Sequence, residues 1–69
     1  MPLSMVSEGS EVEVTRVTGK AEVKKHLENL GFVPGTKVKV LSEVNGDLIV
    51  IVKNVRVAIG KDMANKIMV

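Results

Sequence analysis

The sequence predicts a mainly β domain: a small five-stranded barrel with one helix inserted after the first strand and a short helical turn before the last. Three observations support this prediction. The chain has 69 residues, which make one domain near the lower limit for independent folding. Of these, 45% are hydrophobic and Phe32 is the only aromatic residue, so the core must be built from aliphatic side chains. Short segments rich in β-branched residues, which favour strands, alternate with turn residues.

The first strand is expected over residues 10–17, where Val12 and Val14 alternate with polar and charged residues. Such alternation is typical of a strand with one buried face. The pattern breaks at Arg16, which stands where an apolar residue is due. We therefore predict a bulge or strong bend near Thr15, because the strands of a small barrel must bend for it to close.

A helix is predicted over residues 21–30, followed by a sharp stop. Its apolar residues form one narrow stripe: Val23, Leu27 and Leu30. Gly31 can take the left-handed conformation that commonly ends a helix, and Phe32 then folds back onto Leu27. Residues 33–36, with Pro-Gly at their centre, are predicted to form a β-turn.

Two strands are predicted over residues 36–44 and 47–53, joined by an Asn-Gly dipeptide. This dipeptide is a strong hairpin signal because a type I′ turn needs positive φ at both central residues. Residues 48–52 are apolar on both faces, so their strand is expected to be central or covered on its second side.

A fourth strand is predicted over residues 55–59, with three residues facing inward: Val55, Val57 and Ile59. One helical turn is expected over residues 61–65, and a short last strand over 67–69. Sequential strands usually neighbour each other, and the last must meet the first for a barrel to close. This order of elements predicts an SH3-like barrel.

Residues 9–69 are expected to form this domain, and residues 1–8 a loose lead-in from which Leu3 and Met5 can pack against the barrel. The lead-in has neither the basic region nor the apolar stretch of a signal peptide. The chain contains no cysteine, which points to the cytoplasm because secreted domains this small usually need disulfides. Its longest aliphatic run, residues 48–52, is too short to cross a bilayer. We therefore expect a cytoplasmic protein that is not inserted in a membrane.

The sequence contains no catalytic constellation. There is one histidine and there are no cysteine or tyrosine residues, and no serine lies near His26 in sequence. The glycines stand at turns and do not form a phosphate-binding motif. Because catalysis needs a nucleophile or base beside a supporting partner, we expect a protein that is not an enzyme.

Glu22 and His26 are the best-placed candidate metal ligands. They lie one helical turn apart, so both side chains can point the same way. A tight site needs three or four ligands, and the chain has no second histidine and no cysteine. We expect no resident cofactor and at most weak or transient divalent metal binding. The alternative is a solvated helix face on which the two side chains interact weakly.

The charge pattern favours a protein partner over a nucleic acid. The formal net charge is only +2, whereas nucleic-acid binders usually combine a stripe of cations with stacking aromatics. An apolar surface where the helix meets the C-terminal turn is the candidate partner-binding site: Leu30, Phe32, Met63 and Met68. The alternative is that each of these residues belongs to the core. Four lysines are interpreted as a solubilising face, or alternatively as an anion-binding one: Lys24, Lys25, Lys37 and Lys39.

Residues 27–40, which read Leu-Glu-Asn-Leu-Gly-Phe-Val-Pro-Gly-Thr-Lys-Val-Lys-Val, resemble the signature of the FeoA domain family. That signature is a helix ending in Leu-Gly-Phe or Leu-Gly-Leu, then Pro-Gly, then an alternating strand. Residues 54–59 resemble the family's later Gly-x-Arg-x-Ala-Leu strand, and residues 64–69 resemble its closing alanine, isoleucine and valine. Two positions depart from the pattern, since Asn54 stands where glycine is usual and Gly60 where arginine is common.

The resemblance implies an SH3-like barrel with a non-catalytic accessory or regulatory role in bacterial ferrous iron transport. The partner it implies is the cytoplasmic part of FeoB, a membrane iron transporter with a G-protein domain. The same fold ends iron-dependent repressors of the diphtheria-toxin-repressor type, so a metal-binding or metal-sensing module is an alternative. A small nucleic-acid-binding barrel is another, which the scarcity of aromatic residues opposes. Weak homo-oligomerisation is left open.

Overall fold

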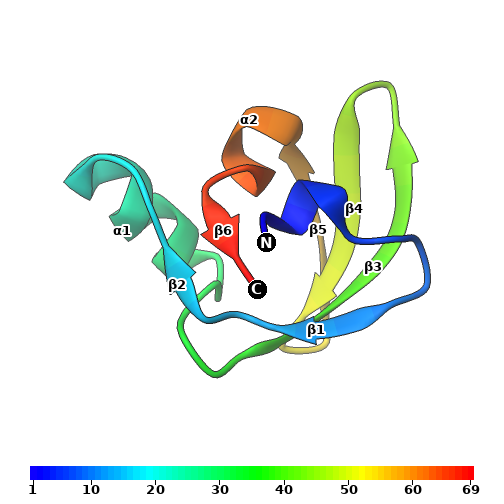
Figure 1. The fold of residues 1–69 in the computed structure, drawn as a ribbon, viewed down its shortest axis with the longest axis horizontal. Helices are drawn as coiled ribbons and strands as arrows, with labels where there is room; N and C mark the ends of the chain where they lie inside the picture. Colours follow the sequence, from blue (N-terminus) through cyan, green and yellow to red (C-terminus); the bar gives the residue numbers. More distant parts are fainter.

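The computed structural model describes residues 1–69 and has the mainly β architecture that the sequence predicts (Figure 1). In chain order the elements are the 3-10 helix η1 (Leu3–Met5), β1 (Glu11–Glu13), β2 (Arg16–Val17), α1 (Ala21–Asn29), β3 (Lys37–Val44), β4 (Asp47–Val52), β5 (Val55–Gly60), α2 (Lys61–Ala64) and β6 (Ile67–Met68). All the predicted strands are present, the first of them divided into β1 and β2. The two predicted helical segments are α1 and α2.

The division of the first strand lets the chain contribute to two sheets. β1 lies at the edge of a four-stranded antiparallel sheet with the order β1-β3-β4-β5, while β2 pairs with β6 in a two-stranded sheet. Between them, the N–H of Val14 donates to the carbonyl of Thr36 (N···O 2.9 Å), and the N–H of Thr15 donates to the carbonyl of Met68 (2.8 Å). The bend predicted near Thr15 is confirmed, because here the chain leaves one sheet for the other (Figure 1).

The core draws residues from both sheets and from all three helical segments. It contains thirteen buried apolar residues and no buried polar or charged side chain. β3 contributes alternate residues, as predicted, and β4 contributes alternate residues as well: Val38, Val40, Leu48, Val50 and Val52. Each fully buried aliphatic side chain contributes roughly 1.5–3 kcal/mol, so an aliphatic core suffices for this small domain.

β4 lies between β3 and β5, so its predicted central position is confirmed. Its outward-facing residues Ile49 and Ile51 are half-buried. In β5, Ile59 is buried and Val57 is half-buried, but the prediction that Val55 faces the core is wrong, since 58% of Val55 is exposed. Val55 directly follows the two-residue turn after β4 and lies at the open end of the sheet, where no other element covers it.

The end of α1 has the geometry that the sequence predicts. Gly31 has a φ of +110°, in the left-handed region that favours glycine. Its N–H donates to the carbonyl of Glu28 (2.9 Å), and the N–H of Phe32 donates to the carbonyl of Leu27 (3.0 Å). These two hydrogen bonds define the Schellman arrangement. They reverse the chain direction and direct Phe32 into the core.

The first residues of the chain are packed against the domain, in contrast to the expected loose lead-in. Of the two residues expected to pack against the barrel, Leu3 is completely buried, whereas Met5 is exposed. Pro2 forms an antiparallel bridge with Met68. Met1 and Val69 exchange two backbone hydrogen bonds, at 2.9 and 2.8 Å. The N-terminal segment therefore covers the edge of β6 opposite β2. A segment this short shows no periodicity, which is why the sequence pattern does not reveal its pairing.

Candidate functional site

The four apolar residues predicted to bind a partner do not form one exposed patch. Phe32 is completely buried in the core, so its assignment to a surface is wrong. Leu30, Met63 and Met68 are half-buried and belong to three separate places: the C-cap of α1, α2 and β6. Leu30 and Met63 pack against the core cluster. Much of the apolar area of Leu30 and Met63 is thus already buried within the domain.

The most exposed large apolar side chains lie elsewhere. Met1 and Met5, at 66% and 72% exposure, belong to the N-terminal segment, and Val44 and Val55 lie near opposite ends of the four-stranded sheet. The sequence interpretation assigned no partner-binding role to these residues. The N-terminal segment offers no signal that separates the buried Leu3 from the exposed Met1 and Met5, because it is too short to show a periodicity.

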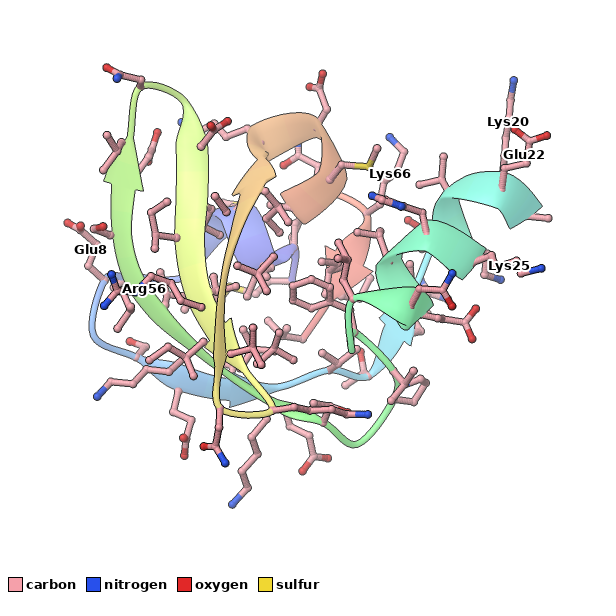
Figure 2. All side chains as sticks on the ribbon, turned by 180° about the vertical axis from the view of Figure 1, so that it is seen from behind. Glu8, Lys20, Glu22, Lys25, Arg56 and Lys66 are labelled. Atoms are coloured by element: carbon pink, nitrogen blue, oxygen red, sulfur yellow. The ribbon has the colours of Figure 1, made fainter.

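The candidate metal ligands Glu22 and His26 are both exposed on α1. Glu22 projects away from the barrel, as do Lys20 and Lys25 beside it (Figure 2). No group of three or more histidine, cysteine, aspartate or glutamate side chains is gathered closely enough to hold a metal ion. The fold therefore brings no third ligand to this pair.

We expect the isolated domain to bind ferrous iron only weakly, with no stoichiometric site of sub-micromolar affinity, because two exposed side chains do not provide a preorganised ligand set. Anaerobic calorimetry with Fe²⁺ measures this directly. The variant His26→Ala should give the same weak heats as the parent chain. A stoichiometric sub-micromolar site that His26→Ala abolishes would contradict the expectation.

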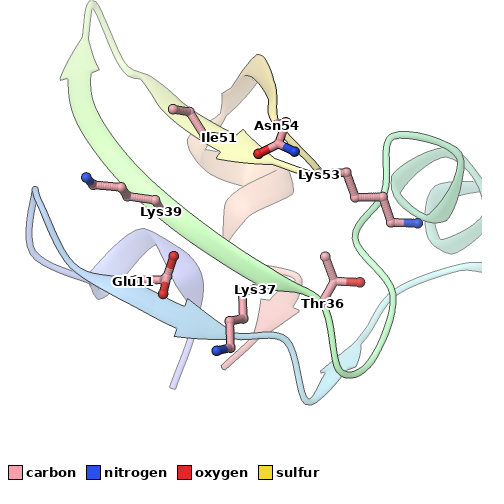
Figure 3. A pocket seen from close by; sticks show the side chains of 7 residues that line it. All are labelled: Glu11, Thr36, Lys37, Lys39, Ile51, Lys53 and Asn54. Carbon is pink, nitrogen blue, oxygen red and sulfur yellow. The ribbon is translucent and has the colours of Figure 1, made fainter.

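The largest surface hollow lies on the outer face of the four-stranded sheet, the face turned away from the core (Figure 3). It has a volume of about 460 Å³ and we call it the lysine hollow. Its lining residues come from β1, the residue before β3, β3, β4 and the turn after β4: Glu11, Thr36, Lys37, Lys39, Ile51, Lys53 and Asn54. Lys39 and Glu11 lie towards one end, and Lys53 and Thr36 towards the other (Figure 3).

Two features create this hollow: buried and exposed residues alternate along β3, and the register of the sheet sets which side chains lie beside them. Val38 and Val40 face the core, so Lys37 and Lys39 face outward. Lys39 pairs across the sheet with Glu11 on one side and with Ile51 on the other. On its outer face the sheet therefore places the apolar Ile51 beside the charged Lys39.

The turn that joins β4 to β5 supplies the third lysine. It consists of Lys53 and Asn54, which have φ values of +51° and +64°, as a two-residue hairpin turn of type I′ requires. The side-chain carbons of Lys53 lie next to Gly31, with Cδ at 3.5 Å from the place that a Cβ on this glycine would occupy. This contact directs Lys53 towards the end of α1.

The four lysines that the sequence suggested as one face are distributed over two. Lys37 and Lys39 line the lysine hollow. Lys24 lines a second, smaller hollow of about 260 Å³ between β2 and α1, together with Arg16, Val17, Glu28 and Pro34. Lys25 projects from α1 away from both (Figure 2).

No side-chain arrangement in either hollow resembles a catalytic centre. Among the hydroxyl groups, Ser4 hydrogen-bonds to the side-chain oxygen of Asn65, and Thr15 and Thr18 bond to backbone carbonyls. No hydroxyl is hydrogen-bonded to His26 or to a carboxylate. The fold and its surface thus define a small SH3-like module whose candidate sites are open surface hollows.

The whole chain, residues 1–69, matches the FeoA domain family, and the chain belongs to this family. A protein of Methanocaldococcus jannaschii named as an Fe(2+) transport protein A is 37% identical over 68 residues, which are 99% of this chain and 83% of that protein. The crystal structure of an iron uptake regulatory protein, FeoA, is 34% identical and has a TM-score of 0.90, with 97% of this chain and 89% of that chain covered.

A second structure supports the fold alone. It is the zinc complex of FeoA from Stenotrophomonas maltophilia, described as a procaryotic SH3 domain protein, with 24% identity and a TM-score of 0.86 over 99% of this chain and 87% of that one. The predicted SH3-like fold and the resemblance to the FeoA family are both confirmed. Neither α1 nor α2 has the length and apolar character to span a bilayer.

Proposed function

We propose that this chain is a non-catalytic accessory protein of ferrous iron transport that binds the cytoplasmic part of a FeoB-type transporter. The observation that carries the proposal is the match of the complete domain to the FeoA family, together with 37% identity to an Fe(2+) transport protein A. The open charged hollow on the outer face of the sheet supports it, because a charged surface can contact a partner of complementary charge.

Binding to the transporter can be measured by titrating the purified cytoplasmic domain of a FeoB-type transporter with this chain in a calorimeter. We expect saturable binding with a Kd on the order of micromolar, typical of transient regulatory contacts. An unrelated GTP-binding domain serves as the control and should give no heat of binding. Equal, non-saturable heats for the two domains would contradict the proposal.

A metal-binding module remains the second candidate function, since the Stenotrophomonas maltophilia FeoA was crystallised with zinc. The exposed pair Glu22 and His26 is all that this chain offers towards such a role. The Fe²⁺ titration described above separates the two functions. Weak iron binding combined with saturable transporter binding is the result expected for an accessory protein.

A further inference from the structure

The lysine hollow carries exposed positive charge that no ion pair neutralises. Lys37, Lys39 and Lys53 are all exposed, and the single ion pair in the structure joins Lys61 to Glu43 at 2.8 Å, away from the hollow. Arg56 extends the positive surface, because it pairs with Ile51 across the sheet. Glu11 and Glu13 on β1, the cross-strand neighbours of Lys39 and Lys37, lie on the same face, so this part of the sheet carries four cations against two carboxylates. A ligand of opposite charge therefore fits the hollow.

The spacing of the lysines matches an extended peptide. Lys37 and Lys39 are two residues apart on one strand and face the same way, so their Cα atoms are roughly 7 Å apart. Alternate residues of any extended segment have this same separation. Acidic residues at alternate positions of such a segment can reach both ammonium groups, while its aliphatic groups cover the half-buried Ile51, which lies beside Lys39 on β4.

The backbone at Lys53 is a second, independent sign of function. A φ of +51° is uncommon for a lysine, and the first position of a type I′ turn normally holds asparagine, aspartate or glycine. Residues held in disfavoured backbone regions cluster at functional sites. The turn itself does not require a lysine here, and the Lys53 side chain extends from the edge of the hollow towards the end of α1 (Figure 3).

From these observations we propose that the lysine hollow is the docking site for an extended acidic segment of a partner protein. The identity of the partner rests on the proposed function. The chemistry of the ligand rests on the hollow alone. Single-stranded nucleic acid fits less well, because no aromatic side chain is present for base stacking and two carboxylates share the face. A membrane surface fits less well, since Ile51 is the one apolar side chain that lines the hollow and it is half-buried.

The direct test is a titration of the ¹⁵N-labelled chain with a heptapeptide of alternating glutamate and valine flanked by glycine. The counterpart with glutamine in place of glutamate is the control peptide. We expect chemical-shift changes at Lys37, Lys39 and Ile51 with the acidic peptide only. These changes should weaken as salt is raised, because screening reduces the contribution of exposed charges. Changes confined to α1 and α2, or equal changes with both peptides, would overturn the proposal.

A matched pair of variants locates the charge that matters. Lys37→Gln/Lys39→Gln removes two charges from the hollow, and Lys20→Gln/Lys25→Gln removes two from the distant surface at α1 (Figure 2). We expect the first variant to bind the acidic peptide about tenfold more weakly, since each exposed charge pair makes a modest contribution. The second should bind it as the parent does. Equal loss in both variants would show only a general charge effect and would overturn the inference.

Binding of an oligothymidine probe more tightly than the peptide would also overturn the inference.

The same variants, tested with the transporter's cytoplasmic domain, separate this inference from the proposed function. If Lys37→Gln/Lys39→Gln loses transporter binding and Lys20→Gln/Lys25→Gln keeps it, the result supports both this inference and the proposed function. Undiminished transporter binding in Lys37→Gln/Lys39→Gln, with loss in Met63→Glu, overturns the lysine hollow as the docking site and leaves the proposed function standing. Binding of the acidic peptide in the hollow without any transporter binding supports the inference and overturns the proposed function.

Discussion

Replacing Phe32 with alanine should lower the free energy of unfolding by about 3–5 kcal/mol, the range for truncating a buried aromatic side chain. Phe32 is the largest fully buried side chain and the only aromatic residue. A domain of 69 residues has a total stability of roughly 3–10 kcal/mol. The loss is therefore comparable to the whole, and thermal or urea unfolding followed by circular dichroism should show a midpoint lowered by more than about 12 °C.

Two controls define the role of Phe32. Val55→Ala truncates an exposed side chain and should change stability by no more than about 0.5 kcal/mol. Phe32→Leu keeps an apolar group in the core and should cost less than Phe32→Ala. If Phe32→Ala unfolded at the parent's midpoint yet no longer bound the transporter domain, Phe32 would be an interface residue and its burial would have no energetic importance.

The second large effect is expected at the end of α1. Gly31→Val places a β-branched residue at a φ of +110°, which costs about 1–2 kcal/mol through backbone strain. The new Cβ would also lie 3.2 Å from Cγ2 of the buried Val52, and such overpacking typically costs about 1–3 kcal/mol. Together these effects predict a destabilisation of about 3 kcal/mol, measured by the same unfolding experiments.

Gly35→Val is the matched control for this prediction. Gly35 also has positive φ, at +92°, but no atom lies within 4 Å of the position that its Cβ would take. Gly35→Val should lower the free energy of unfolding through backbone strain alone, by about 1–2 kcal/mol. Equal destabilisation by the two substitutions would show that the contact with Val52 relaxes freely, and parental stability of Gly31→Val would contradict the left-handed end of α1.

The elements that the sequence predicts correctly are those determined by local conformation. The end of α1 follows from Gly31, and the β-turn over residues 33–36 closes through a hydrogen bond from Thr36 N–H to the Val33 carbonyl at 3.0 Å. The hairpin between β3 and β4 has positive φ at both Asn45 and Gly46. In each case the conformational preferences of one or two residues leave few backbone alternatives.

The features that the sequence could not predict depend on contacts between distant segments. The pairing of the first residues with β6, at the other end of the chain, is one of these features. Phe32 looks like a surface candidate in the sequence, since a single aromatic residue after a helix fits a core or an interface equally well. The lysine hollow required the register of β1 with β3 and of β3 with β4.

The sequence by itself thus determined the family, the order of the elements and the turns between them, because these depend on residues adjacent in the chain. Tertiary structure alone decided which apolar residues are core and which charges share a surface. The physical reason is that burial and charge proximity depend on where whole strands lie relative to one another. A one-residue change of register would turn Lys37 and Lys39 inward, and no local pattern of residues specifies the partner strand.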